Sequence, residues 1–182
     1  MTFGAENRGI AGNTNAALTM ATGEFVALCD HDDLLAPDAV RCILEAAQDG
    51  ADFVYTDEDK VSADGTRFFE PHLKPDFAPD SLRSGNYICH ITAASRGLMN
   101  AVGGLRPGFD GSQDHDLALR LSENAAKITH IPRILYHWRM LDTSFSHQKA
   151  QTCADAAARA VADQLRRLHT VSYTHLTLPT KR

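Results

Sequence analysis

The chain has 182 residues, of which 43% are hydrophobic, enough apolar material for the core of one domain. Its formal net charge of −5 offers no basic surface for nucleic acid, and no apolar run approaches the ~18 residues of a membrane-spanning helix. Four widely spaced cysteines without a Cys-x-x-Cys pair, and no signal peptide before the first element, favour reduced thiols in a cytosolic protein.

The first predicted elements are a glycine-containing loop, Glu6 to Gly12, and a short helix from Asn13 to Ala21 that Gly23 ends. A doubly wound domain normally places a strand–helix–strand unit ahead of such a segment, and none precedes it. The expectation is therefore an N-terminally truncated domain that lacks its first strand–helix–strand. Such a chain should bind a nucleotide weakly by itself, because that site needs strands from both sides of the point where strand order reverses.

The stretch from Phe25 to Asp33 carries the main functional signal. Five apolar residues, Phe25 to Cys29, suit a central strand of a mainly parallel sheet, whose faces are both covered. The run stops at Asp30-His31-Asp32-Asp33, and ligands of open α/β sheets bind outside the carboxyl ends of the strands. Clustered carboxylates repel one another unless a cation such as Mg²⁺ or Mn²⁺, shared with substrate phosphates, holds them. The alternative is a solvated acidic loop that caps the next helix.

The middle of the chain predicts a helix and a hairpin. Pro37 fits the first turn of a helix that ends at Gly50, and its apolar stripe consists of Ala39, Val40, Ile43, Leu44 and Ala47. A strand from Phe53 to Thr56 runs into Asp57-Glu58-Asp59. Asp64-Gly65 then predicts a hairpin-type turn between Val61 and Phe68.

A proline-rich surface loop from Pro71 to Pro79 and a strand from Ile88 to Ala94 follow. The segment from Gly111 to Asp116 opens a helix whose shared face consists of Leu117, Ala118, Leu121 and Ala125. Asp114 and Asp116 lie in the first turn, where acidic residues can simply complement the helix dipole.

The segment from Ile128 to Arg139 predicts a strand, a break at Pro132 and a second strand. Strict alternation places His137 and Arg139 on one face of that strand. Both side chains are costly to bury without a partner, which an anionic ligand or a metal would supply. The alternative is a pair of surface residues on an edge strand.

An alanine-rich helix from Ala150 to Leu168 closes the domain, with Ala154, Ala157, Val161, Leu165 and Leu168 on one side. The threonine-rich remainder has no clear period and reads as a disordered or non-native tail. The predicted organisation is a partial domain over residues 1–168 and a tail over 169–182.

Five segments together resemble a family-two glycosyltransferase with the GT-A fold, most closely the bacterial enzymes that build O-antigen and other envelope polysaccharides, such as rhamnosyltransferases. They are Glu6 to Gly12, Leu28 to Asp33, Tyr55 to Lys60, Gly111 to Leu117, and His130 to Arg139. The resemblance implies an α/β, Rossmann-like fold with a mainly parallel sheet and flanking helices. It also implies an inverting, metal-dependent transfer of a sugar from a nucleoside-diphosphate sugar to a glycan or lipid-linked acceptor, in the cytoplasm or at the inner face of the membrane.

Roles carried over from the family fall on named positions. Asp32 matches the metal ligand, and Asp30 matches the residue that contacts the ribose or, through water, the metal. His137 and Arg139 match an element that reaches the metal or the diphosphate, and Arg8 lies in a donor-binding segment. Relatives carry an arginine where this chain has Asn13-Thr14-Asn15, so one phosphate contact is missing.

The family's catalytic base lies in a Glu-Asp pair, which is Gln113-Asp114 here, so the resemblance assigns the base to Asp114. A base opposite the leaving diphosphate would deprotonate the acceptor hydroxyl, and direct attack would invert the anomeric centre.

Two alternatives stay open. One is a haloacid-dehalogenase-type phosphatase, disfavoured because Leu34 stands where those enzymes carry Thr or Val. The other is a fragment that binds an acceptor glycan without catalysis.

Overall fold

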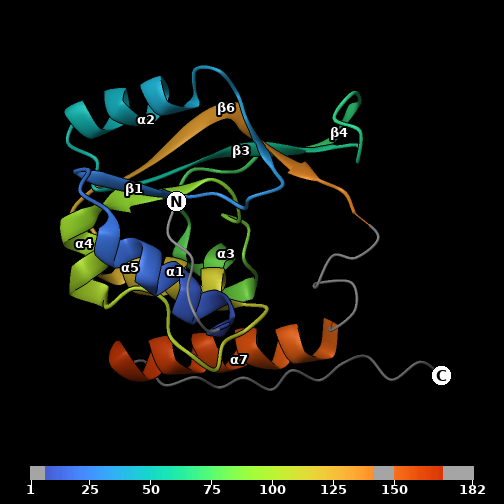
Figure 1. The fold of residues 1–182 in the computed structure, drawn as a ribbon. Helices are drawn as coiled ribbons and strands as arrows, with labels where there is room; N and C mark the ends of the chain where they lie inside the picture. The colour runs from blue at the N-terminus through green and yellow to red at the C-terminus, as the bar shows by residue number, and fades with distance from the viewer. Residues whose placement is uncertain (1–6, 142–149, 170–182) are drawn as a thin grey trace.

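The computed structural model describes residues 7–141 and 150–169, which form an α/β architecture around a six-stranded sheet. Figure 1 shows α2 on one face of the sheet and α5 on the other, with α7 packed against α5. The helices are α1 (Gly9–Met20), α2 (Ala39–Gln48), α3 (Pro79–Ser84), α4 (Arg96–Val102), α5 (Gln113–Asn124) and α7 (Ala150–Arg167). The strands are β1 (Phe25–Leu28), β2 (Leu34–Leu35), β3 (Phe53–Val61), β4 (Phe68–His72), β5 (Thr92–Ser95) and β6 (Ile128–Arg139). None of these helices is long and apolar enough to cross a bilayer.

The sheet runs β1-β5-β3-β6-β2, and β4 pairs with β3 as a hairpin. Only β3 and β6 are parallel among the described strands, whereas the other pairings are antiparallel. The α/β class is confirmed, but the expectation of a mainly parallel sheet is wrong for these strands.

β1 lies at one end of this strand order, and the expectation that it would be central is also wrong. Its apolar run has another cause, since Val26 and Leu28 pack against the main core from the edge. A short apolar run indicates burial but does not distinguish a central strand from a covered edge strand.

The two long strands extend further than the sequence predicts. β3 continues through Asp57-Glu58-Asp59, and the predicted Asp64-Gly65 turn joins it to β4. β6 is unbroken, because its register with β3 shifts between Thr56 and Asp57 and leaves Pro132 in the irregularity. A proline has no N–H to donate, so a bulge is one of the few places where a strand tolerates it.

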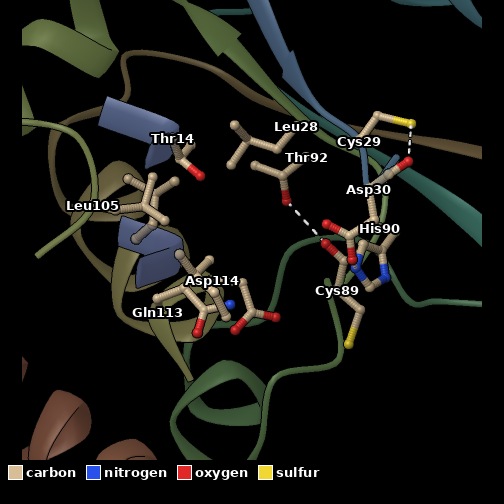
Figure 2. Close-up of a pocket in the computed structure, with 12 residues that line it drawn as sticks. Thr14, Leu28, Cys29, Asp30, Cys89, His90, Thr92, Leu105, Gln113 and Asp114 are labelled. Carbon is tan, nitrogen blue, oxygen red and sulfur yellow. Dashed lines mark hydrogen bonds and ion pairs between the residues drawn. The ribbon is translucent and has the colours of Figure 1, made fainter. Parts of the chain in front are cut away.

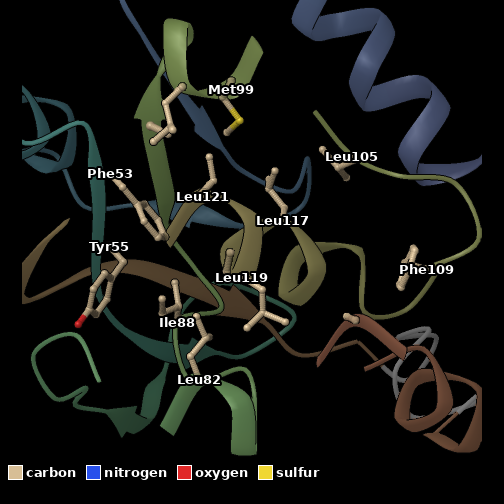
Figure 3. Close-up of a cluster of buried hydrophobic side chains, with 14 of the residues drawn as sticks. Phe53, Tyr55, Leu82, Ile88, Met99, Leu105, Phe109, Leu117, Leu119 and Leu121 are labelled. Atoms are coloured by element: carbon tan, nitrogen blue, oxygen red, sulfur yellow. The ribbon is translucent and has the colours of Figure 1, made fainter. Parts of the chain in front are cut away.

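The two largest hydrophobic clusters lie on opposite sides of the sheet. Figure 3 shows the larger one, in which Phe53 and Tyr55 of β3 meet Leu117, Leu119 and Leu121 of α5. The smaller core joins α2 to the other face, and its buried members include Ile43, Ala46, Val54, Ile91 and Tyr136. The predicted face of α5 is confirmed at Leu117, Ala118 and Leu121, which are all buried.

Three helices differ from their predicted limits or faces. α1 begins at Gly9, inside the predicted loop, because Ala11 packs into the main core. On α2 the exposed side chains include Val40 and Leu44, and the buried stripe is Ala39, Cys42, Ile43 and Ala46. On α7 the buried stripe is Ala156, Ala160 and Gln164, and Ala154 is exposed. A helix rich in alanine carries a weak apolar stripe, so neighbouring helices decide which face is buried. The tail beyond residue 169 lies outside the described ranges.

Candidate active site

A cavity of about 110 Å³ lies between α1, the end of β1, the turn before β5 and the start of α5. Figure 2 shows Asp114 on one side of this pocket and Asp30 with His90 on the other. The remaining lining residues are Ile10, Thr14, Leu28, Cys29, Cys89, Thr92, Leu105, Gln113 and Leu117. The fold thus brings the acidic segment after β1 to the same cavity as the predicted base of α5.

The carboxylates after β1 differ in what surrounds them. The Asp30 side chain is 67% exposed and lies 3.9 Å from His90 Nε2, at the mouth of the pocket. The Asp32 side chain is 35% exposed, and its Oδ1 lies 3.7 Å from Nδ1 of the neighbouring His31. Both therefore have oxygens available to a ligand.

Asp33 instead anchors the acidic segment to β6. Its Oδ2 accepts a hydrogen bond from the Tyr136 hydroxyl, and its Oδ1 accepts one from the backbone N–H of Arg139 at 2.7 Å. Burial raises the pKa of the Asp33 carboxyl, although these two hydrogen bonds oppose the shift. Asp33 therefore has a structural role, because its bonds to β6 hold in place the segment that carries Asp30 and Asp32.

Asp114 lies in the first turn of α5, as predicted, but its carboxylate is more than a complement to the helix dipole. The side-chain amide of Asn86 donates a hydrogen bond to Asp114 Oδ2 at 2.9 Å. Asn86 in turn accepts a hydrogen bond at Oδ1 from the backbone N–H of Cys89. The turn before β5 therefore holds one oxygen of Asp114 and leaves the other available to a substrate.

A buried ion pair fixes the same turn from behind. Lys74 Nζ lies 3.2 Å from Glu58 Oε2 and donates to the carbonyls of Ile88 and His90. Glu58 Oε2 also accepts the backbone N–H of His90 at 2.8 Å. Burial alone would raise the pKa of Glu58, but the hydrogen bonds and charges of His90 and Lys74 outweigh it and lower that pKa to about 2. The Glu58–Lys74 pair therefore holds the backbone of His90 on both sides, with Glu58 at its N–H and Lys74 at its carbonyl.

His90 forms one wall of the pocket. Its ring stacks on Tyr136 with centroids 4.8 Å apart and lies 3.5 Å from Glu58. Burial by itself would lower the pKa of His90, but the interaction of its ring with the Glu58 carboxylate raises it instead. The site thus includes an imidazole whose charged form the surrounding carboxylates favour.

The other predicted site residues lie around this pocket rather than in it. Arg139 donates from Nε to the Asp32 carbonyl at 2.5 Å and from Nη1 to the Ala63 carbonyl at 2.8 Å. His137 Nδ1 is 2.5 Å from Asp59 Oδ1, and Arg8 is exposed just before α1. Asp32 and His137 do not complete a cage, since the described part of the chain has no group of three or more His, Cys, Asp or Glu placed to hold a metal.

Sequence reasoning missed Asn86 and His90, and it found Glu58 only as one of several acidic residues after an apolar run. A usable signal was present in the turn itself, where Asn86, Cys89 and His90 interrupt an otherwise apolar segment. Their partners are far away in the sequence, so no periodicity reveals the pairing.

Comparisons with known proteins cover most of this chain. Residues 2–101 match the model of glycosyl transferase family 2. The O-antigen biosynthesis protein RfbC of Myxococcus xanthus is 40% identical over 158 residues, which cover 85% of this chain and 12% of that protein.

Two solved structures share the fold. S. aureus TarS 1-349 in complex with UDP-GlcNAc superposes with a TM-score of 0.64 at 14% identity, covering 86% of this chain and 47% of TarS. The mannosyltransferase PcManGT of Pyrobaculum calidifontis, in complex with GDP-Man and Mn²⁺, superposes with a TM-score of 0.54 at 18% identity. The superposition covers 91% of this chain and 56% of PcManGT. The expected GT-A fold is confirmed, and the chain spans about half of each solved structure.

Proposed function

Because this chain belongs to glycosyl transferase family 2, we propose that it transfers a sugar from a nucleoside-diphosphate sugar to a glycan or lipid-linked acceptor. The similarity to an O-antigen biosynthesis protein supports an acceptor that belongs to a cell-envelope polysaccharide. The solved relatives that share the fold hold UDP-GlcNAc in one case and GDP-Man in the other, which supports a nucleotide-sugar donor.

The observation that carries the proposal is the meeting of Asp30 and Asp114 in one pocket. Donor and acceptor must face each other across the anomeric carbon, so groups for each are needed on opposite walls. Asp30 comes from the carboxyl end of β1, and Asp114 comes from α5. A merely solvated acidic loop would not require this arrangement.

In the proposed mechanism Asp114 takes the proton of the acceptor hydroxyl as the hydroxyl attacks the anomeric carbon. Asn86 holds Oδ2, which leaves Oδ1 to accept that proton. Direct attack from the face opposite the diphosphate forms one glycosidic bond and breaks one sugar–phosphate bond, with inversion. The sugar carries oxocarbenium character in the transition state, as in glycoside hydrolysis.

Mg²⁺ or Mn²⁺ is the proposed cofactor, and Asp30 and Asp32 fit it. Both expose hard oxygen ligands, and Mg²⁺ commonly uses one or two carboxylates together with substrate phosphates instead of an all-protein cage. Bound there, the ion would stabilise the negative charge that develops on the leaving diphosphate. The mannosyltransferase structure with Mn²⁺ supports this choice. His137 would join only if its Nε2 reached the ion, since Nδ1 faces Asp59.

Arg8 and Arg139 are the proposed cationic contacts of the diphosphate. Arg139 also fixes the acidic segment, because its guanidinium donates to the carbonyl of Asp32. We expect its loss to weaken donor binding both through charge and through movement of that segment.

A panel of nucleoside-diphosphate sugars tests the proposal. The 182-residue chain would be incubated with each donor and Mn²⁺, and release of the nucleoside diphosphate would be measured with and without EDTA. We expect release from at least one donor, lost with EDTA and restored by Mn²⁺. Release that EDTA leaves unchanged would contradict the metal assignment, and binding of acceptor glycan without any release would favour the glycan-binding alternative.

A further inference from the structure

A second cavity, of about 290 Å³, lies on the sheet beside the β3–β4 hairpin. Its walls come from three strands, and the lining residues are Glu58, Asp59, Lys60, Glu70, His72 and Trp138. This volume is close to the lower end of the ~300–1,000 Å³ typical of small-molecule sites. None of the proposed donor-binding groups lines it.

The register of the sheet explains why Glu58, Lys60, His72 and Trp138 share one surface. Lys60 of β3 is the direct neighbour of Trp138 on β6, and Glu58 is the neighbour of both Tyr136 and His72. Directly opposed residues of adjacent strands project from the same face. A half-buried indole therefore forms the floor beside a row of polar groups from β3 and β4.

This cavity adjoins the candidate active site. His90 lines the active-site pocket, and its ring lies 6.2 Å from that of Trp138 and 3.5 Å from Glu58, which lines the second cavity. A ligand that is longer than one unit and enters the active site could therefore continue past His90 onto Trp138.

The charges of the cavity indicate what class of ligand it takes. Each carboxylate of the lining already has a partner: Glu58 pairs with the buried Lys74, Asp59 with His137 and Glu70 with Lys60. The ammonium of Lys60 is thus already paired, and nothing in the lining favours a diphosphate. Carboxylates and an imidazole beside an indole face instead suit a ring with hydroxyl groups at its edge and C–H groups on its face.

We infer that this Trp138 cavity is a subsite for a neutral or amino-sugar ring of the acceptor glycan. The inference rests on the proposed glycosyl transfer, and it places the acceptor chain along the wall that carries His90, across the pocket from Asp114. A sugar ring stacks on the indole of Trp138, and Glu70 and His72 accept hydrogen bonds from its hydroxyl groups.

Intrinsic fluorescence tests this directly, because Trp138 is the single tryptophan of the chain. The full chain would be titrated with maltotetraose, chitotetraose and chitosan tetramer, and separately with UDP and GDP in the presence of Mn²⁺. We expect at least one oligosaccharide to change the emission of Trp138 saturably. Glu70→Gln should weaken that binding several-fold. Glu45→Gln is the matched control on α2, where the carboxylate is exposed and pairs with Arg41, and should leave binding unchanged.

Steady-state kinetics with the same acceptor gives a second measurement. Trp138→Ala should raise the KM for the acceptor about tenfold while donor hydrolysis stays as in the wild type. Oligosaccharide binding that leaves Trp138 emission unchanged, equal affinity of Glu70→Gln and the wild type, or no binding by any of the sugars would each overturn the subsite. Loss of donor hydrolysis in Asp32→Ala, by contrast, bears on the donor site alone. The fluorescence binding assay needs no turnover, so it can contradict the Trp138 subsite without contradicting the proposed sugar transfer, and the reverse also holds.

Discussion

Among single residues, Asp114 offers the sharpest test, because the proposed base and a simple helix-dipole role make different predictions. We expect Asp114→Asn to keep donor affinity while sugar transfer falls by ~10²–10⁴-fold, the usual contribution of a general base. Calorimetry with a nucleoside diphosphate and Mn²⁺ would report the affinity, and product formation would report the rate. Near-normal turnover in this variant would leave Asp114 with the dipole role only.

Asn86 is predicted to act through Asp114. Its side-chain amide donates to Oδ2 and so fixes the direction in which the Asp114 carboxylate points. In Asn86→Ala we therefore expect a kcat about tenfold lower, with the KM for the donor unchanged. Asn100→Ala on α4, where the side chain is exposed, is the control and should keep the wild-type kcat. A wild-type kcat in Asn86→Ala would contradict the positioning role.

At the scale of elements, the Glu58–Lys74 pair ties β3 to the turn that precedes β5. Because the pKa of folded Glu58 is lowered from 4.5 to about 2, its contribution to stability is present above pH 4.5 and is lost as the pH falls towards 2. We expect Glu58→Gln to lower the free energy of unfolding by ~3–5 kcal/mol at pH 7, since it leaves the buried Lys74 ammonium unpaired.

Urea unfolding of Glu58→Gln and the wild type at pH 7, 4 and 3 would measure this. The difference between the two should shrink as the pH falls. A difference that stays constant from pH 7 to 3 would show that the Glu58 charge is not what stabilises the turn.

A second ionic cluster joins α5 to α7 and to the loop before α5. Asp116 is fully buried and pairs with Arg106 and Arg120, and Arg106 also reaches Asp163 of α7. Asp116→Asn should therefore destabilise the chain by ~3–5 kcal/mol, as expected when one member of a buried pair is removed. The surface pair of Arg41 and Glu45 is the contrast, and Glu45→Gln should cost ~1 kcal/mol or less by the same chemical unfolding experiment. If Asp116→Asn and Glu45→Gln lowered the free energy of unfolding equally, burial would not explain the strength of the Asp116 cluster.

For the whole molecule, the threonine-rich tail is predicted to be dispensable. It has neither a helical nor a strand period, so it should add little to the core. We expect a chain that ends at His169 to melt within a degree or two of the 182-residue chain, as measured by calorimetry. A drop of many degrees would show that the tail packs against the domain.

The sequence by itself determined the classes of element and the segments that carry chemistry. The acidic cluster that includes Asp30 could be singled out because it directly follows an apolar strand. Asp114 was identified only through the family resemblance, since an acidic residue in the first turn of a helix can simply complement its dipole. Hydrophobic periodicity correctly placed Leu117, Ala118 and Leu121 among the buried residues of α5. It did not predict that every residue from His115 to Leu121 is buried, because α5 packs against α3, α4 and α7 as well as the sheet.

Only the tertiary structure decided what depends on contacts between distant segments. The edge position of β1, the antiparallel pairings and the buried faces of α2 and α7 follow from which surfaces pack together, and local sequence encodes this weakly. The same holds for the site: Asn86 reaches Asp114, and His90 stacks on Tyr136, because the turn before β5 is held between β3 and α5. Side-chain periodicity reports the geometry of one element, whereas such pairs are set by the packing free energy of the whole chain.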